Sequence, residues 1–457
     1  MSATAGPWSG RRLHFIGVAG AGMSGYARAA HALGARVSGS DASWSPYLER
    51  LAADGVLQAN VGHAAENVPS GPDVEVFYSS AVPEENVERR AARERGIPER
   101  PRAELLAELT ALRRTLAVAG THGKTTTASM IVHALRGAGL RPGWLVGGAV
   151  GGELPNAEWG EGEWLVVEAD ESDRSMLSLN VEIALLTNVE LDHHSSYGSL
   201  AELRAAFAEF LARSQSAVVW GRPELLELRA GAVTPYDLDG VTLTPGGSSF
   251  SWRGHHVRLA VPGAHNALNA VGALEAARLA GAGEDGAIAG LAGFHGAARR
   301  FQPLGRGPSG ALLYDDYAHH PSEIAATLAA ARTFTHRRLV AVFQPHLYSR
   351  TQLLAREFGR ALAEADVIAV LDVYPARERP EDHPGVSGLM IAEAAADSAA
   401  GRPVYWLPTF ADAEPALRAL LREGDIVLVL GAGDVDELGR SLAGTPLRAH
   451  AAGPVAP

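Results

Sequence analysis

Short apolar runs recur along the chain, and several of them end in a glycine-rich turn that leads into a helix-compatible segment. One run covers 13–18, and the helical pattern after it reaches Leu33 before the next strand at 36–38. A second run covers 116–119 and precedes a helical pattern over 127–135. Buried strands that alternate with helices are typical of open, mostly parallel α/β sheets.

The alternation continues toward the C-terminus. Further strands are expected at 74–80, 164–169, 182–188, 311–315, 339–343, 367–371, 404–407 and 426–430, and further helices at 322–333, 351–365, 386–399 and 411–422. A strand-rich stretch over 216–261 indicates a small β-hairpin excursion, and a long Ala-rich helix follows Pro262.

Two connecting segments divide this pattern into domains. A helix-rich connector occupies 98–114, and a Gly/Pro/Ser-rich linker without apolar periodicity occupies 306–310. We therefore predict an α/β protein with a Rossmann-like N-terminal domain (1–112), a central P-loop ATPase-type domain (113–306) and a C-terminal Rossmann-like domain (307–457).

The most informative loop follows the strand at 116–119. It reads Gly120-Thr121-His122-Gly123-Lys124-Thr125-Thr126 and leads into a helix. Backbone N–H groups and the helix N-terminus of such a loop cradle phosphates, Lys124 adds a positive charge, and Thr125 offers a hydroxyl to Mg²⁺. Val118 stands where a regular Walker A loop has glycine, so this loop is tighter. The alternative is a plain glycine turn that happens to carry a lysine.

Acidic clusters follow two strands of the predicted central domain. The strand at 164–169 delivers Glu168, and the strand at 182–188 leads to His193. Mg²⁺ prefers oxygen ligands and takes few of them from the protein. Because both strand ends are expected at the edge that carries the phosphate loop, we predict that Glu168 and His193 support Mg²⁺. The alternative is that they are solvated turn residues.

A first glycine loop precedes the helix that ends at Leu33. Its candidate diphosphate-binding residues are Gly17, Gly20, Gly22, Met23 and Ser24. Asp41 ends the next strand and is expected near a ribose or base, and Ser79 and Ser80 end the strand at 74–80, where ligands of open α/β sheets lie. The glycine spacing is not that of NAD enzymes.

Composition narrows the class of protein. The chain has 457 residues, 47% apolar and 20% charged residues, a formal net charge of −12 and no cysteine. This balance is typical of a globular protein and argues against broad binding to nucleic acid or anionic membranes. Thiol catalysis and Cys-ligated zinc are excluded. No apolar run approaches the roughly 18 residues that span a bilayer, and the N-terminus lacks a signal-peptide core, so a cytoplasmic protein is expected.

Nine motifs in order carry a family resemblance. They are HFIGVAGAGMSG, GTHGKTTTASM, VVEADESD, LLTNVELDH, PGAHNALNA, ARRFQ, DDYAHHPSE, FQPHLYSR and GAGD. Together they closely resemble the three-domain Mur ligases, and in particular those that add L-alanine to UDP-N-acetylmuramate. The resemblance implies an ADP-forming ligase of peptidoglycan precursor synthesis, with ATP and Mg²⁺ as cofactors and an acyl-phosphate intermediate.

The resemblance also implies roles for individual residues. It places Gly120 to Thr126, Asn266, Asn269, Arg300, Asp316 and His319 at ATP, Thr125, Glu168 and His193 at the metal, and His346 and Arg350 near the reacting groups. Lys124, Glu168, His193, Arg300 and Asp316 are the implied catalytic residues. The residues assigned to the UDP-sugar are Gly17, Gly20, Gly22, Met23, Ser24, Asp41, Ser79 and Ser80.

Three positions depart from the family pattern, namely Ala19, Arg174 and Ser195. Arg174 stands where a small residue is common, so we expect it to alter the loop after Glu168. The nearest rival function is a recycling ligase that adds an intact tripeptide to UDP-N-acetylmuramate. A nucleotide-dependent oxidoreductase or a non-catalytic nucleotide-binding module explains fewer motifs. The sequence is compatible with a monomer or a homodimer.

Overall fold

The computed structural model describes residues 6–151, 154–192 and 196–444. Contacts divide the chain into two compact units. The first comprises Met1–Asp239 with Leu268–Ala297, and the second comprises Gly240–Ala267 with Ala298–Pro457. Each unit is described by itself. Within the described residues, no helix combines the length and apolar character needed to cross a membrane.

The first unit begins with a five-stranded parallel sheet in the order β3-β2-β1-β4-β5. Its elements are β1 (Arg12–Ile16), α1 (Ala21–Ala32), β2 (Arg36–Asp41), α2 (Pro46–Ala53), β3 (Ala59–Val61), β4 (Val74–Tyr78), α3 (Val87–Glu94), β5 (Glu99–Pro101) and α4 (Arg102–Ala111). This is the strand order of a Rossmann-like half, and its order reverses between β1 and β4. The predicted N-terminal fold is confirmed.

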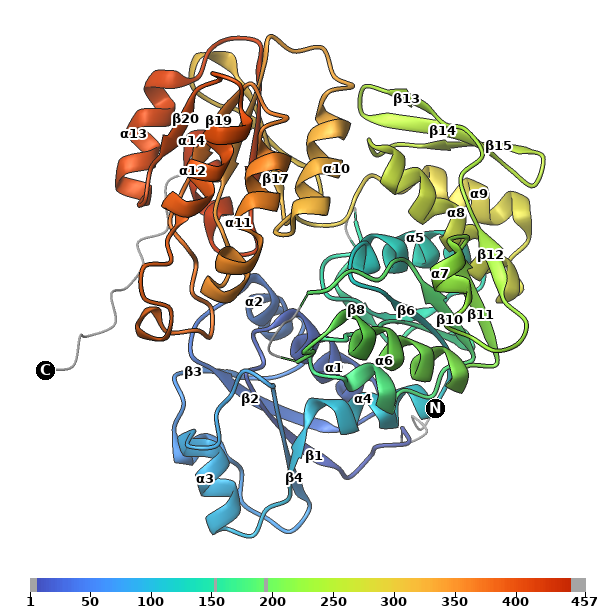
Figure 1. Ribbon diagram of the computed structural model, residues 1–457. Helices are drawn as coiled ribbons and strands as arrows, with labels where there is room; N and C mark the ends of the chain where they lie inside the picture. Colours follow the sequence, from blue (N-terminus) through green and yellow to red (C-terminus); the bar gives the residue numbers. More distant parts are fainter. Residues whose placement is uncertain (1–5, 152–153, 193–195, 445–457) are drawn as a thin grey trace, which may run out of the picture. The chain divides into compact units, whose positions relative to one another are not determined.

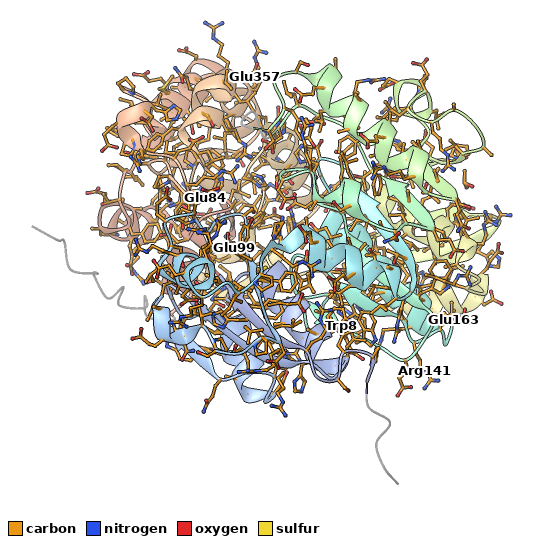
Figure 2. The ribbon with its side chains drawn as sticks, turned by 90° about the horizontal axis from the view of Figure 1, so that it is seen from below. Trp8, Glu84, Glu99, Arg141, Glu163 and Glu357 are labelled. Atoms are coloured by element: carbon orange, nitrogen blue, oxygen red, sulfur yellow. The ribbon has the colours of Figure 1, made fainter. Side chains whose placement is uncertain are left out.

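Both faces of this sheet are covered by helices (Figure 1). Leu13 and Phe15 of β1 pack in one apolar cluster with residues of α1, α2 and α4, whereas Ile16 packs in another with Ala92 of α3. The alternation follows from the two-residue period of a strand. Glu99, labelled in Figure 2, accepts a hydrogen bond of 2.9 Å from Nε of Arg89 and so holds α3 to β5.

A buried polar cluster lies between this sheet and α3. The Glu88 carboxylate receives Ser40 Oγ at 2.6 Å and Asn67 Nδ2 at 2.8 Å, and its Oε2 lies 3.0 Å from His14 Nε2. Burial alone would raise the pKa of Glu88, but these hydrogen bonds outweigh burial and lower the pKa to about 2. The cluster ties β1 and β2 together beneath the first glycine loop.

The same unit holds a seven-stranded sheet in the order β12-β11-β10-β6-β9-β7-β8, parallel except for the β7–β8 pair. Its elements are β6 (Arg114–Ala119), α5 (Lys124–Gly137), β7 (Gly143–Leu145), β8 (Ala157–Glu158), β9 (Trp164–Glu168), β10 (Ile183–Leu186), α6 (Leu200–Arg213), β11 (Ser216–Trp220), α7 (Pro223–Leu226), β12 (Thr234–Tyr236) and α9 (Glu284–Ala292). One apolar cluster runs from Leu13 through α4 to Ala117, Val167 and Phe207. This shared core explains why both sheets fall in one compact unit.

The second unit contains a six-stranded sheet in the order β16-β17-β21-β18-β19-β20 and the small antiparallel sheet β13-β14-β15. Its elements are β13 (Thr242–Thr244), β14 (Gly247–Trp252), β15 (His255–Leu259), β16 (Gln302–Arg306), β17 (Leu312–Asp316), α10 (Pro321–Ala331), β18 (Arg338–Phe343), α11 (Tyr348–Leu362), β19 (Val367–Val370), α12 (Gly388–Ser398), β20 (Val404–Trp406), α13 (Phe410–Leu420), β21 (Asp425–Leu430) and α14 (Val435–Leu442). Helix α8 (Ala264–Leu279) crosses the division between the units.

One expectation from the sequence needs correction. Only β13 to β15 of the stretch 216–261 form a separate sheet, drawn side by side in Figure 1, because β11 and β12 extend the seven-stranded sheet. The predicted linker at 306–310 shares only Arg306 with β16, and residues 307–310 connect β16 to β17. The domain boundaries at 112 and 306 stay a prediction.

Candidate functional site

The first glycine loop lies where the strand order of the first sheet reverses. Ile16 is in register with Ser40 and Tyr78, so the loop emerges between the ends of β2 and β4. Gly17 has φ +83°, and a Cβ there would lie 3.0 Å from the Cβ of Ser79. Only glycine fits both the conformation and the close approach.

The loop is held by its backbone and leads into an uncapped helix. Ala19 N donates to Asp41 Oδ2 at 2.8 Å, so that carboxylate fixes the loop. Gly20, the N-cap of α1, provides no side-chain hydrogen bond to the helix N-terminus. The loop therefore presents a helix N-terminus suited to an anion such as a diphosphate.

Two of the predicted diphosphate residues use their side chains for packing. Met23 and Ser24 are buried. Ser24 Oγ donates to Ala21 O at 2.9 Å and accepts from Asn156 Nδ2 at 3.1 Å. Any contact of Ser24 with a diphosphate would compete with these bonds. Ser79 is half-buried beside Gly17, and Ser80 is exposed.

The phosphate loop lies between two strand ends of the seven-stranded sheet. Val118 is in register with Glu168, and Ala119 with Leu186, so β9 and β10 end beside it. Gly120 has φ +128°, and a Cβ there would lie 2.1 Å from Thr187 Oγ1. Gly123 is the N-cap of α5 with φ 82° and provides no side-chain cap. The register confirms that the predicted strand ends share one edge.

Residues that follow β10 hold the backbone of the phosphate loop through hydrogen bonds. Asn188 accepts from His122 N at 2.9 Å through Oδ1 and donates to His122 O at 3.0 Å through Nδ2. Thr187 Oγ1 also donates to His122 O, at 2.7 Å. Thr121 Oγ1 accepts from Glu190 N and donates to Glu190 O, each at 2.9 Å. These bonds fix the backbone of the loop and occupy the N–H groups of Thr121 and His122, so a phosphate would be met by the N–H groups at the N-terminus of α5.

Lys124 is the cation of this loop, with a side chain that is 12% exposed. Its Nζ donates to Gly120 O at 2.6 Å, to Thr121 O at 3.1 Å and to Glu171 Oε1 at 2.9 Å. Burial alone would lower the pKa of Lys124, but the nearby Glu171 carboxylate and its acidic neighbours outweigh burial and raise it. The ammonium is therefore charged at neutral pH. Nothing in the sequence pattern marked Glu171 as the partner of Lys124.

Two oxygen donors meet at the start of α5. Thr125 Oγ1 lies 3.1 and 3.0 Å from the two carboxylate oxygens of Glu168, and Gly147 N donates to Glu168 Oε2 at 2.8 Å. A carboxylate beside a hydroxyl suits a hard cation, so this donor set fits Mg²⁺. His193, the third predicted metal residue, lies outside the described residues, as do His194 and Ser195.

The two predicted asparagines of α8 have different surroundings. Asn269 lies against the phosphate loop, where its Oδ1 is 3.0 Å from the Cβ position of Gly123. Asn266 Nδ2 donates to Pro262 O at 2.6 Å at the start of the helix. Thr126 is buried in the first turn of α5.

In the second unit, Arg299 joins its own segment to the end of β17 and to the loop after β21. Its Nε donates to Asp315 Oδ2 at 3.1 Å, and its two Nη atoms donate to Gly431 O and Gly433 O at 2.9 Å each. Burial raises the pKa of Asp315 to about 6, although Arg299 opposes this shift. The residue predicted from the sequence is the adjacent Arg300, whose Nη1 lies 3.4 Å from Glu323 Oε1.

Asp316 and His319 are held by hydrogen bonds within the second unit. The Asp316 carboxylate accepts from Phe301 N and Ala318 N at 2.8 Å each, and burial raises its pKa. His319 N donates to Glu323 Oε2 at 3.0 Å. The His319 ring centroid lies 6.0 Å from that of His346.

Arg350 completes this group of predicted site residues. It is buried, and its Nη1 donates to His346 O at 3.2 Å. The structure thus brings His319, His346 and Arg350 together at one edge of the six-stranded sheet. Their contribution to ligand binding stays a prediction.

Comparisons with known proteins agree with this architecture. Residues 12–114 match the catalytic domain of the Mur ligase family, residues 118–277 match the Mur ligase middle domain, and residues 299–433 match the glutamate ligase domain of Mur ligases. A UDP-N-acetylmuramate–L-alanine ligase from Mycobacterium sp. (strain JLS) is 44% identical over 462 residues, which cover 94% of each chain.

Solved structures share the fold over nearly the whole chain. A UDP-N-acetylmuramate–alanine ligase from Thermotoga maritima has a TM-score of 0.80 and 27% identity, and the match covers 95% of this chain and 98% of that one. A murein peptide ligase from Psychrobacter arcticus has a TM-score of 0.71 and 22% identity, and the match covers 95% of this chain and 98% of that one. At this level of identity the match supports a shared fold only.

The fold and the two glycine loops define a multi-domain α/β protein with two uncapped helix N-termini, a geometry suited to phosphates. The domain matches and the relative at 44% identity identify it further: the chain belongs to the Mur ligase family. It is accordingly an enzyme, a ligase that forms carbon–nitrogen bonds. The family, the three-domain α/β architecture and the ligase class expected from the sequence are confirmed.

Proposed function

We propose that this protein joins L-alanine to the lactyl carboxylate of UDP-N-acetylmuramate while ATP is converted to ADP and phosphate. The observation that carries the proposal is the 44% identity, over 94% of the chain, to a UDP-N-acetylmuramate–L-alanine ligase. The product is a peptidoglycan precursor, so the enzyme serves cell-wall synthesis, cell shape and cell division. The cytoplasmic location predicted above belongs to this proposal, and the choice between monomer and homodimer stays open.

The reaction has two balanced steps. A lactyl carboxylate oxygen attacks the γ-phosphorus of ATP, and the bond from that phosphorus to the β,γ-bridging oxygen breaks, which releases ADP and leaves an acyl phosphate. The amine of L-alanine then attacks the acyl carbon. The carbon–oxygen bond to phosphate breaks, phosphate leaves, and the nitrogen loses a proton to give the amide.

The phosphate loop supplies positioning and charge for the first step. Lys124 needs to exchange the carbonyls of Gly120 and Thr121 for phosphate oxygens, which accept stronger, charge-assisted hydrogen bonds. Thr125 and Glu168 would hold Mg²⁺, with His193 as the predicted third group. Mg²⁺, when bound, offsets negative charge on the phosphates. Asn188 keeps the loop in place by bonding both sides of the His122 peptide.

The first glycine loop is assigned to the UDP diphosphate. Gly17, Gly20 and Gly22 allow close backbone approach, the N-terminus of α1 favours negative charge, and Ser79 lies at the point where the strand order reverses. Asp41 serves mainly by holding Ala19 N. In the second unit, Arg300, Asp316 and His319 are proposed at ATP, and His346 and Arg350 near the reacting groups.

Phosphate release tests the proposal. We expect ATP- and Mg²⁺-dependent release that requires both UDP-N-acetylmuramate and L-alanine. Equal or faster release with the tripeptide L-alanyl-γ-D-glutamyl-meso-diaminopimelate in place of alanine would favour the recycling ligase instead. An absorbance change with NAD(P)H and no phosphate release would contradict both ligase functions.

A further inference from the structure

Arg102 stands where the carboxyl edges of the two sheets of the first unit meet. It is the first residue of α4 and directly follows β5, whose last residue is in register with Tyr78 at the end of β4. This places Arg102 on the edge that carries the first glycine loop. Its Nη1 lies 3.3 Å from the position that a Cβ on Gly22 would occupy.

The other nitrogens of Arg102 face the loop after β9. Nη2 donates to Asp170 Oδ2 at 2.7 Å, and Nε donates to Asp173 Oδ2 at 2.8 Å. The side chains of Arg102, Asp173 and Asp170 are 16%, 20% and 37% exposed, so solvent screens the Asp173 pair less than the Asp170 pair. The planar guanidinium thus holds two points of one loop at fixed spacing, which a lysine ammonium does not reproduce.

Those two aspartates flank the partner of Lys124. Glu171 lies between Asp170 and Asp173 in the sequence, is fully buried, and pairs with Lys124 at 2.8 Å. A continuous set of contacts therefore runs from Gly22 through Arg102 and the Asp170–Asp173 loop to Lys124. It joins the two glycine loops without passing through the second unit.

We propose that Arg102 is a positioning residue that couples UDP-sugar binding at the first glycine loop to nucleotide binding at the phosphate loop. An anion at the first loop draws on the guanidinium that anchors the Asp170–Asp173 loop. The hold of Glu171 on Lys124 changes with it, and Lys124 is released toward the nucleotide. The inference rests on the proposed function, because it takes the UDP-sugar and ATP as the two ligands.

Arg100 provides a matched control. It lies in β5, two residues before Arg102, and makes three ion pairs of 2.9, 2.7 and 2.7 Å with Glu75, Glu104 and Glu108. All of its partners belong to the first sheet and α4. Arg100→Lys therefore disturbs a similar number of ion pairs without touching either glycine loop.

The test measures binding of the non-hydrolysable analogue AMP-PNP with Mg²⁺ by calorimetry, with and without saturating UDP-N-acetylmuramate. We expect the wild type and Arg100→Lys to bind AMP-PNP about fivefold or more tightly with the UDP-sugar present, within the usual range of coupling between sites. In Arg102→Lys the ratio of the two affinities should fall to about 1. Asp173→Asn, which keeps the Arg102–Asp170 pair, should give an intermediate ratio.

A purely structural role would lower the melting temperature of Arg102→Lys and leave the ratio as in the wild type, which would overturn the proposal. A ratio of 1 in the wild type would also overturn it. Failure of the wild type to bind UDP-N-acetylmuramate at all would instead contradict the proposed function.

Discussion

The two glycine loops of the first unit share one geometry and differ in what surrounds them. Each follows a buried parallel strand and leads into a helix whose N-cap glycine gives no side-chain hydrogen bond. The first loop contains no basic residue and is fixed by Asp41. The second contains Lys124, is clamped by Thr187 and Asn188, and faces the carboxylate of Glu168.

This difference in surroundings fits two kinds of phosphate site, one that only binds a phosphate and one that transfers it. A diphosphate that stays intact needs only N–H groups and a helix N-terminus. A phosphoryl group that is transferred also needs charge placed where charge moves during the reaction. Under the proposed function, the shared geometry would serve binding, and the added Lys124 and carboxylates would serve catalysis. Four predictions separate these contributions.

The largest effect is expected for Lys124→Ala. Turnover should fall about 10³-fold or more, since a preorganised charge at the transferring group is lost. Affinity for UDP-N-acetylmuramate, measured alone by calorimetry, should stay within about twofold. Because this variant leaves the buried Glu171 without Lys124, the double variant Lys124→Ala, Glu171→Gln serves as the control for folding. Loss of UDP-sugar binding in the folded double variant would contradict the division of tasks.

Alanine at Gly120 and at Gly20 should have very different effects on stability. At Gly120 the positive φ and the 2.1 Å approach to Thr187 Oγ1 add strain and overpacking, so Gly120→Ala should lower the free energy of unfolding by about 3 kcal/mol or more. Gly20 has φ −72°, and the nearest atom to an added Cβ would be 3.8 Å away, so Gly20→Ala should cost about 1 kcal/mol or less. Urea denaturation measures both. Similar midpoints would show that the second loop is less tightly clamped than its contacts indicate.

The sequence predicted the loops well, because their features are local. An apolar run, glycines and a helical pattern are adjacent in the chain, and β1, β6 and β9 begin or end within two residues of their expected limits. The partners of the loops were harder to predict. Arg102 and Asp170 are 68 positions apart, so their pairing depends on how two sheets pack.

Two other features had no clear local signal. β16 contains Pro303 and Gly305 and pairs through an irregular register, so the sequence did not indicate a strand there. Arg299 and Arg300 are indistinguishable as a pair in the sequence. The positive φ of Arg299, 56°, accompanies a side chain that reaches Asp315 and the Gly431 loop.

Removing the support of one glycine loop should weaken the binding of only the ligand that is assigned to that loop. Asn188→Ala removes both bonds to the His122 peptide, so AMP-PNP binding should weaken about tenfold, equivalent to about 1.4 kcal/mol. Asp41→Ala should weaken UDP-N-acetylmuramate binding by a similar factor through loss of the Ala19 bond. Each affinity is measured without the other ligand. Equal weakening of both ligands by either variant would mean that the loops are not supported independently.

The smallest effect concerns acid stability beneath the first loop. The pKa of Glu88 is lowered to about 2, below its ordinary value of 4.5, so its contribution to stability is full above about pH 4.5 and is lost as pH falls toward 2. At pH 3.5 the loss should be about 1 kcal/mol. The end of strand β6, which leads to the phosphate loop, carries no titratable group, since Leu116 to Ala119 are buried and apolar.

Urea unfolding of the wild type and Glu88→Gln at pH 7 and pH 3.5 isolates the contribution of Glu88, because glutamine does not titrate. The wild type should lose about 1 kcal/mol more than the variant over this interval. Equal losses would mean that the polar cluster does not support the first loop through the ionised carboxylate.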